Sequence, residues 1–285
     1  MNLALLGVGL MGYPVAERLL QSGHQLTVYN RTIAKVYPLK EKGARIARTP
    51  QEAWSEAEGI LLTLSDAQAI ADVLFSGTYS DFLGKTIIQM GTIGPSESRA
   101  IQKELAARGA DYFECPVLGS RQEAAEGTLI LLVGSSDAQF QKWKGFFKAL
   151  GPDPWHIGGV GQAAALKLAL NQLIASHAVG FSLSLGLIER NHIPVEIFMD
   201  ILRQSALYAP MFDKKLANWL RRDYARPNFP AKHLFKDVAL IFQEAKDKGL
   251  STESLEALRQ LLLKTMDKGL GDLDYSSVFN AVNNI

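Results

Sequence analysis

Lys167 and Asn171 stand four residues apart in a stretch of the chain that is otherwise strongly apolar. Ala163–Leu166 and Leu168–Leu170 flank the lysine, and a charged group among such neighbours requires a reason. A positioned ammonium stabilises the negative charge that develops on a carbonyl oxygen during reduction, and it can donate the proton that this oxygen takes. Because residues four apart share one helix face, Asn171 is placed to orient the lysine or a substrate. The alternative is a lysine whose stem packs along an apolar helix while its head stays in solvent.

Three glycines near the start of the chain have the spacing of a phosphate-binding turn. The segment Gly7-Val8-Gly9-Leu10-Met11-Gly12 directly follows an apolar run and opens a helix-like segment. In such a turn the first glycine permits a tight bend, the second lets the backbone approach a diphosphate, and the third allows close packing of helix on strand. The N-terminus of the helix then offers N–H groups to the phosphates. The sequence therefore predicts a dinucleotide cofactor that contacts Gly7, Gly9, Leu10, Met11 and Gly12; a glycine-rich turn without a ligand is the alternative.

The end of the second predicted strand distinguishes between the two nicotinamide dinucleotides. An acidic residue there would accept hydrogen bonds from the ribose hydroxyls of NAD, but this chain has Asn30-Arg31-Thr32. The guanidinium of Arg31 and the hydroxyl of Thr32 suit the 2′-phosphate of NADP. We therefore expect NADPH to be preferred over NADH, with Asn30, Arg31 and Thr32 as cofactor contacts. The alternative is that Arg31 is a solvated surface charge.

Short apolar runs alternate with helix-like segments through the first half of the chain. The strand candidates are Asn2–Gly7, Gln25–Asn30, Ile60–Leu64, Thr86–Met90, Asp111–Glu114 and Leu129–Gly134. Amphipathic stretches such as Tyr13–Gln21 and Glu97–Ala107 lie between them. This alternation predicts a parallel sheet with right-handed crossovers, and the near-continuous apolar runs predict strands buried on both faces. Residues 1–161 are therefore expected to form an α/β, Rossmann-type, doubly wound domain that binds NADP.

Helical periodicity replaces the strand pattern after Gly161 and runs almost to the C-terminus. Breaks are expected near His192-Ile193-Pro194, Tyr208-Ala209-Pro210, Pro227–Pro230 and Lys248-Gly249. Residues 162–285 are predicted to form an all-helical domain for substrate binding and dimerisation, joined to the first through a long helix over 162–190. Polar residues interrupt this apolar helix, so a buried core helix is favoured over a membrane span.

Composition argues against several classes of protein. Of 285 residues, 47% are hydrophobic and 21% are charged, the balance of an ordinary soluble globular protein. The 30 Lys and Arg nearly balance the 29 Asp and Glu, so no nucleic-acid partner is expected. Cys115 is the only cysteine, which rules out an intrachain disulfide and favours a reducing, cytoplasmic location. No His, Cys and carboxylate set has the spacing of metal ligands, so no metal is expected.

Four segments, taken in order, resemble the β-hydroxyacid dehydrogenase (3-hydroxyisobutyrate dehydrogenase-like) family, and the resemblance covers nearly the whole chain. They are Gly7–Gly12 with Ala16, Leu19 and Gly23; Glu114–Ser120 with Gly127-Thr128-Leu129; Gly159-Val160-Gly161 with Lys167 and Asn171; and Phe229–Asp237. The family includes 3-hydroxyisobutyrate dehydrogenases and reductases of tartronate semialdehyde, glyoxylate and succinic semialdehyde. Leu64-Ser65-Asp66, Glu114 and the fourth segment look most like the glyoxylate/succinic semialdehyde reductase branch.

The resemblance also implies roles for individual residues. Lys167 would be the proton donor, with Asn171 beside it, and Lys236 would lie over the nicotinamide end of the cofactor. Further cofactor contacts would come from Leu64, Ser65 and Thr92, and the substrate contacts would come from Thr92, Leu118, Gly119, Ser120, Phe229 and Asp237. Leu118 departs from the family, which usually has a serine there that contacts the substrate carboxylate. The backbone amides of Gly119 and Ser120 are still expected to be able to bind an anion.

The resemblance implies NADPH-dependent reduction of a small carboxylic acid bearing an aldehyde, of the glyoxylate or succinic semialdehyde type. A dehydrogenase of the 3-hydroxyisobutyrate or tartronate semialdehyde type is the alternative within this class. A non-catalytic NADP-binding module is the alternative from another class; it and an imine reductase are disfavoured by the presence of Lys167. A decarboxylating sugar-phosphate dehydrogenase would need a much longer helical domain. The long apolar helix further predicts a homodimer, and because polar residues interrupt it, no membrane partner is expected.

Overall fold

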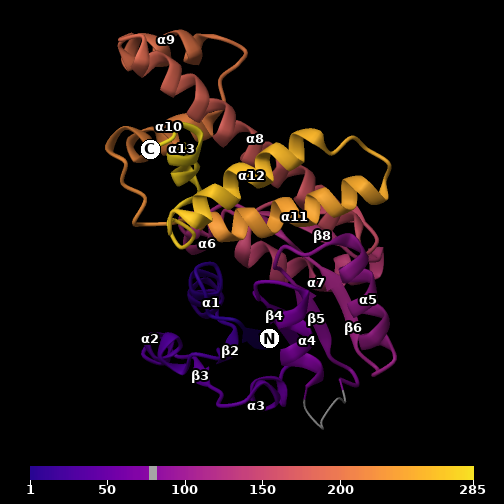
Figure 1. Cartoon of the computed structure of the whole chain (residues 1–285). Helices are drawn as coiled ribbons and strands as arrows, with labels where there is room; N and C mark the ends of the chain where they lie inside the picture. The colour runs from indigo at the N-terminus through magenta and orange to yellow at the C-terminus, as the bar shows by residue number, and fades with distance from the viewer. Residues whose placement is uncertain (77–81) are drawn as a thin grey trace. The chain divides into compact units, whose positions relative to one another are not determined.

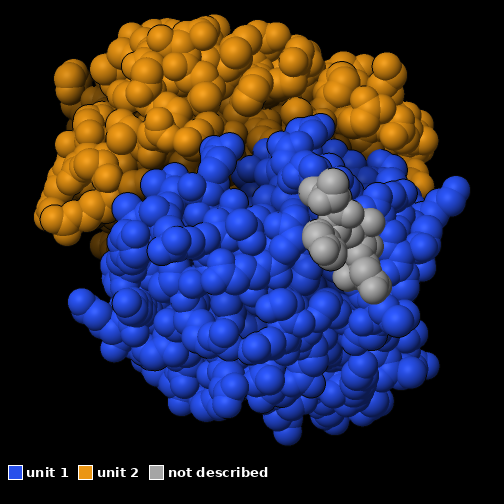
Figure 2. Space-filling model, turned by 90° about the horizontal axis from the view of Figure 1, so that it is seen from below, with its two compact units in different colours: residues 1–168 blue, residues 169–285 orange. Residues whose placement is uncertain are grey.

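The computed structural model describes residues 1–76 and 82–285 of the chain (Figure 1). The chain divides into two compact units, Met1–Leu168 and Ala169–Ile285, which Figure 2 shows in blue and orange. The first unit alternates strands with helices, and the second consists of helices and their connections. The predicted fold class, a Rossmann-type sheet followed by an all-α domain through a long helix, is confirmed. The predicted domain boundary at residue 161 stays a prediction.

The described strands of the first unit form one nine-stranded sheet in the order β3-β2-β1-β4-β5-β6-β8-β7, with β9 beside β8. Their bounds are β1 Asn2–Leu6, β2 Gln25–Tyr29, β3 Arg45–Ile46, β4 Gly59–Leu62, β5 Thr86–Gln89, β6 Asp111–Glu114, β7 Val117–Leu118, β8 Ile130–Gly134 and β9 Trp155–Gly158. Neighbouring strands from β3 to β6 in this order pair in parallel. All six predicted strands are present, and the carboxyl ends of the five that run parallel, β1, β2, β4, β5 and β6, lie at one edge of the sheet.

The other end of the sheet differs from the wholly parallel arrangement that the sequence predicted. Strand β8 runs antiparallel to β6, with Gly134 opposite Glu114, and β7 also pairs antiparallel with β8. A parallel pair needs a long crossover, usually through a helix. The connection before β8 holds only α6 (Arg121–Glu126), whose six residues span about 9 Å, so the chain turns back instead. Strands β3, β7 and β9 were not predicted, because two have only 2 residues and the third is partly exposed.

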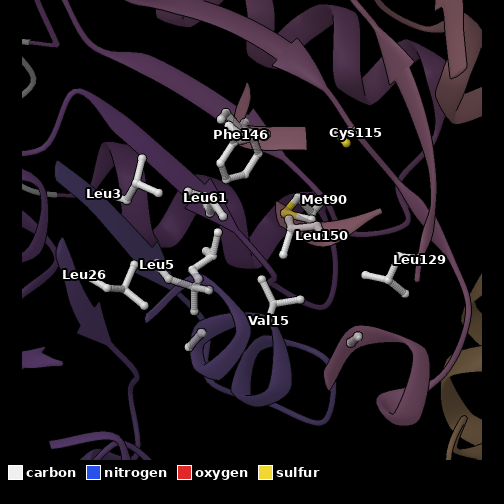
Figure 3. Packing of buried hydrophobic residues seen from close by; sticks show 14 of the residues in the cluster. Leu3, Leu5, Val15, Leu26, Leu61, Met90, Cys115, Leu129, Phe146 and Leu150 are labelled. Carbon is white, nitrogen blue, oxygen red and sulfur yellow. The ribbon is translucent and has the colours of Figure 1, made fainter. Parts of the chain in front are cut away.

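Helices cover both faces of the sheet, and the alternation along β1 shows why. Leu3 and Leu5 pack in one cluster with residues of α1 and α7, whereas Ala4 and Leu6 pack in another with residues of α3, α4 and α5. Figure 3 shows the first cluster, in which Leu5 packs together with Val15 and Phe146. The helices are α1 (Gly12–Gln21), α2 (Tyr37–Lys40), α3 (Pro50–Trp54), α4 (Ala67–Phe75), α5 (Pro95–Ala106) and α7 (Asp137–Leu150), with a 3-10 turn at Ile33–Lys35.

The second unit contains the helices that the periodicity predicted, with breaks where the sequence placed them. They are α9 (Val195–Gln204), α10 (Pro210–Arg221), α11 (Ala231–Asp247), α12 (Glu253–Asp267) and α13 (Val278–Val282), with a 3-10 turn η2 at Tyr275–Ser277. Pro210 begins α10, where its missing N–H has no partner to lose, and Pro230 directly precedes α11. Helices α11 and α12 lie side by side (Figure 1).

Helix α8 (Gln162–Arg190) is continuous over 29 residues, as predicted. In the described part of the chain it is the one helix long and apolar enough to cross a membrane, with a mean hydropathy of 1.3 over its most apolar window. Only 39% of that window is buried, so the prediction of a buried core helix holds for less than half of it. Leu173, Leu183 and Leu187 remain exposed, because one layer of neighbours cannot cover a helix that is apolar on most sides.

Candidate active site

The glycine-rich turn between β1 and α1 has the geometry that a diphosphate requires. Gly7 has a φ of +104°, and a Cβ added there would lie 2.7 Å from the carbonyl oxygen of Thr63. A Cβ on Gly12 would lie 2.1 Å from the carbonyl oxygen of Gly7. A Cβ on Gly9 would meet nothing within 4 Å. The first and third glycines are thus required by packing, whereas the second leaves the backbone open to a ligand.

The start of α1 also presents hydrogen-bond donors. Among the described residues, the amides of Gly9, Leu10 and Met11 donate no hydrogen bond, and no side chain caps the helix. The hydroxyl of Thr63 donates to the carbonyl oxygen of Gly7 over 2.5 Å and fixes the turn against β4. Open amides at the positive end of a helix dipole bind anions. This turn therefore fits the diphosphate of a dinucleotide.

Asn30 supports the glycine-rich turn from the end of β2. Its Oδ1 accepts the amide of Val8 over 3.0 Å, and its Nδ2 donates to the carbonyl oxygen of Thr32 over 2.9 Å. The side chain predicted as a cofactor contact thus has a structural role in holding two loops together. Arg31 and Thr32 are exposed beside it, and Arg31 pairs with no carboxylate in the described residues.

The turns that follow β4 and β5 pack closely on each other. A Cβ on Gly91 would lie 2.6 Å from the carbonyl oxygen of Leu64. Ser65 donates its hydroxyl to Asp66, and Asp66 caps α4 by accepting the amide of Ala69 over 2.8 Å. The distinctive Ser65-Asp66 pair therefore has a local structural reason. Thr92 is half-buried directly after Gly91.

In the turn between β7 and α6, one of the two amides expected to bind an anion, that of Ser120, is engaged by the chain itself, and the anion site stays a prediction. The amide of Ser120 donates to Oε2 of Glu123 over 2.6 Å, and the Ser120 hydroxyl donates to the same oxygen. A carboxylate of the chain itself thus occupies the position expected for a ligand anion, as part of a capping box. Gly119 has a φ of +131°, and Leu118 is half-buried opposite Ile130 of β8.

Lys167 and Asn171 lie one turn apart on α8, as their spacing predicted. Lys167 is half-buried in the second turn of the helix, whereas Asn171 is only 1% exposed. The Nδ2 of Asn171 donates to Oδ2 of Asp237 over 2.6 Å. The Oδ1 of Asn171 is buried without a hydrogen-bond donor in the described residues. An orphaned buried acceptor is rare in proteins, and its donor can come from a ligand, a water or a moving side chain.

Asp237 is the centre of a charged group on α11. Its Oδ1 lies 2.8 Å from Nζ of Lys236, close enough for an ion pair although outside hydrogen-bond geometry. Burial, and then the charges of Lys236 and Lys232, lower the pKa of His233, so its imidazole is neutral near pH 7. The contact between Asp237 and Asn171 joins residues 66 apart in the chain, and nothing in their local sequence indicates it.

Phe229 is half-buried at the end of the loop that precedes α11. Its carbonyl oxygen accepts the amide of Tyr275 over 2.9 Å, and its ring packs edge-on against the Tyr275 ring. In the same unit, Lys215 and Asp274 form a buried ion pair of 2.7 Å. The loop is therefore held by a buried charge network that sequence reasoning did not anticipate. In the sequence, the segment Asp272–Ser276 indicates only an ordinary turn, so the buried ion pair of Asp274 was not predicted.

In the sequence, Glu114 indicated only the branch of the family. The carboxylate is 1% exposed and accepts the amides of Gly161 and Ala164 at the start of α8, over 2.8 and 3.0 Å. A carboxylate at the end of a buried apolar strand was the available signal, because such a group must find donors.

Two family models together match almost the whole chain. The model of the NAD binding domain of 6-phosphogluconate dehydrogenase matches residues 2–159. The model of the NAD-binding region of NADP-dependent 3-hydroxyisobutyrate dehydrogenase matches residues 161–282. The second match favours a hydroxyacid dehydrogenase over a sugar-phosphate dehydrogenase, in agreement with the short helical region.

Individual relatives agree with these models. The chain is 33% identical to glyoxylate/succinic semialdehyde reductase 1 of Arabidopsis thaliana, over 99% of this chain and 98% of that protein. It is 30% identical to the cytokine-like nuclear factor N-PAC of Drosophila melanogaster, over 96% of this chain but 46% of that protein. The structure of 3-hydroxyisobutyrate dehydrogenase from Salmonella typhimurium superposes with a TM-score of 0.89 at 21% identity, covering 98% of this chain and 99% of its own. The chain therefore belongs to the β-hydroxyacid dehydrogenase family of NAD(P)-dependent oxidoreductases, which act on CH–OH groups.

Proposed function

We propose that the protein reduces a small aldehyde acid, of the glyoxylate or succinic semialdehyde type, to the hydroxy acid with NADPH. The observation that carries this proposal is the pair on α8: a half-buried Lys167 one turn before a buried Asn171 whose Oδ1 lacks a donor. The substrate class is supported by the reductase of Arabidopsis thaliana, the relative with 33% identity. The cofactor is supported by the open amides before α1 and by Gly9.

The side chains of the proposed site have separate roles in this reaction. A bound nicotinamide cofactor supplies hydride to the carbonyl carbon. The Lys167 ammonium stabilises the growing negative charge on the carbonyl oxygen and donates a proton to it, and its half-buried position lets solvent replace that proton. Asn171 cannot rotate freely, because Asp237 holds its Nδ2. Its Oδ1 is therefore fixed as an acceptor, which suits an N–H of the ammonium or the O–H of the product.

NADPH rather than NADH is proposed because of the groups that follow β2. Arg31 and Thr32 are exposed there, and no carboxylate stands at the strand end to accept ribose hydroxyls. Asn30 is engaged with Val8 and Thr32, so the guanidinium is the group available for a 2′-phosphate.

The test is NADPH oxidation, followed at 340 nm with glyoxylate, succinic semialdehyde and tartronate semialdehyde. Lys167→Ala is compared with Lys144→Ala, a change of an exposed lysine on α7. We expect kcat to fall by orders of magnitude in the first variant only, with NADPH binding retained. Unchanged turnover in Lys167→Ala would refute the role of this lysine. The order of the three substrates decides between the aldehyde-acid reductase and the 3-hydroxyacid dehydrogenase alternative.

The second candidate function is a non-catalytic NADP-binding module, because one relative, N-PAC of Drosophila melanogaster, is a nuclear factor by name. Tight NADPH binding without turnover of any aldehyde acid or hydroxy acid would favour that module. Lys167 favours the enzyme instead.

We also propose a homodimer, formed through an apolar face of α8 and α9. Leu183 and Leu187 are one turn apart on α8, and Ile197 and Ile201 are one turn apart on α9; each exposes more than half of its surface. A second copy would cover such a face by twofold symmetry. Light scattering of Ile197→Glu should give a monomer, whereas Leu250→Glu, which changes an exposed leucine outside this face, should remain a dimer. The cytoplasmic location stays a prediction.

A further inference from the structure

The residue that directly precedes helix α8 has no side chain with which to cap it. Gly161 has a φ of +98°, and a Cβ there would lie 2.0 Å from a guanidinium nitrogen of Arg99. The positive φ therefore disfavours the serine, threonine or aspartate that usually caps a helix start, whereas the arginine end could move aside for a side chain. The amides of the first turn need acceptors from elsewhere in the fold.

Glu114 supplies these acceptors from a distance of 47 residues in the chain. Its Oε1 accepts the amides of Gly161 and Ala164, so one oxygen satisfies two donors of the first turn. No cation forms an ion pair with this carboxylate in the described residues. The positive end of the α8 dipole is thus the favourable electrostatic partner of a buried charge.

The carboxylate is also held from the opposite side. The Ser98 hydroxyl on α5 donates to its Oε2 over 2.5 Å, and Ser98 shares a 2.8 Å hydrogen bond with the hydroxyl of Tyr112. Gly134 of β8 lies opposite Glu114 of β6, and a Cβ there would lie 2.6 Å from the glutamate side chain. Glu114 is therefore confined to one position between β8, α5 and the start of α8.

The position of the helix start determines the position of Lys167. Lys167 follows Gly161 by six residues, or about 9 Å along the helix axis. Because α8 is continuous, a shift or rotation of its first turn moves the lysine side chain with it. A displacement of about 1 Å in a catalytic group can lower turnover by roughly two orders of magnitude.

We propose that Glu114 is a positioning residue for Lys167, acting through its hydrogen bonds to the amides of Gly161 and Ala164. The inference rests on the proposed role of Lys167. In this proposal, the buried side chain of a strand residue determines the position of the proton donor. This role requires a side chain long enough to reach the two amides and an oxygen placed to accept their hydrogen bonds. A neutral side chain of the same length can therefore replace the carboxylate.

The test compares two conservative variants. Glu114→Gln keeps the reach and the acceptor oxygen but removes the charge, whereas Glu114→Asp keeps the charge but is one methylene too short. We expect Glu114→Gln to retain kcat within about threefold, and Glu114→Asp to lose about 10- to 100-fold in kcat with an unchanged Kd for NADPH. Tyr112→Phe is the control, because it weakens the same buried network without touching α8; its kcat should equal that of the wild type.

Amide hydrogen exchange provides a measurement that needs no turnover. Exchange at residues 161–168 should speed up at least tenfold in Glu114→Asp and stay close to wild type in Glu114→Gln and Tyr112→Phe. The rate at which an amine-reactive reagent modifies Lys167, measured relative to Lys236 as the internal reference, should change only in Glu114→Asp. If Lys167→Ala does not lower turnover, the proposed function is refuted. The modification rate of Lys167 still tests whether Glu114 positions this lysine, because it needs no turnover. Equal kcat in Glu114→Asp and wild type, equal losses in both Glu114 variants, or an unchanged Lys167 modification rate would overturn the proposal.

Discussion

Gly9 and Gly12 lie three residues apart in the same turn, and the structure predicts opposite consequences for the same substitution. A Cβ on Gly12 would lie 2.1 Å from the carbonyl oxygen of Gly7 and 2.6 Å from the hydroxyl of Thr63. A Cβ on Gly9 would meet no atom of the chain within 4 Å. Gly12→Ala should therefore destabilise the fold, whereas Gly9→Ala should leave stability unchanged and weaken only cofactor binding.

The size of each effect follows from these distances. A Cβ contact below 3.0 Å is essentially absent from real structures, so α1 must move about 1 Å from β1 to admit the methyl group of Gly12→Ala. Overpacking of this kind costs about 1–3 kcal/mol, which for a chain of this size lowers Tm by roughly 2–12 °C. In Gly9→Ala the methyl group stands where a diphosphate would approach, and a loss of about 10- to 100-fold in NADPH affinity corresponds to roughly 1.4–2.8 kcal/mol.

The assay pairs thermal unfolding without ligand with a fluorescence titration of NADPH for both variants. The reasoning requires that stability and affinity separate: a lower Tm for Gly12→Ala, and wild-type Tm with weakened binding for Gly9→Ala. If Gly9→Ala binds NADPH as tightly as the wild type, the open side of this turn is not where the diphosphate lies. If Gly12→Ala unfolds at the wild-type temperature, the contact between α1 and β1 is less tight than the distances indicate.

Three further outcomes are expected. Arg31→Ala should raise the KM for NADPH by about tenfold or more and leave the KM for NADH nearly unchanged, because a charge-assisted contact to the 2′-phosphate contributes about 1.5–3 kcal/mol; steady-state kinetics with both cofactors checks this. Lys215→Met should lower the free energy of unfolding in urea by about 3–5 kcal/mol, because it leaves the buried Asp274 carboxylate without its cation, and adding Asp274→Asn should recover part of the loss. Burial raises the pKa of Glu114, so the folded chain binds a proton there more tightly than the unfolded chain does. The contribution of Glu114 to stability should therefore fall as pH rises from the ordinary glutamate pKa through the raised one, and Glu114→Gln should lose this dependence in urea midpoints measured across that range.

Part of the candidate site was predictable because its residues act over short distances in the chain. The glycine-rich turn and the pair Lys167 and Asn171 are local patterns, fixed by the geometry of one turn and one helix. The sequence assigned Asn30 to the cofactor, which stays a prediction, and the structure adds a contact that was not predicted, the support of the Val8 amide. At Ser120 the capping contact was not predicted: Glu123, three residues on, accepts the amide that was expected to be available to a ligand.

The sequence by itself determined the order of the six longer predicted strands, the glycine-rich turn, the long helix α8 and the placement of Lys167 and Asn171 on one face of it. These features follow from periodicity and spacing over a few residues, where backbone geometry leaves little choice. Only the tertiary structure decided that β8 runs antiparallel to β6, that Asp237 holds Asn171, and that Glu114 caps α8. Each of these contacts joins residues that are far apart in the chain. Such contacts form where buried polar groups must find partners, and which partner is in reach depends on how the whole unit packs.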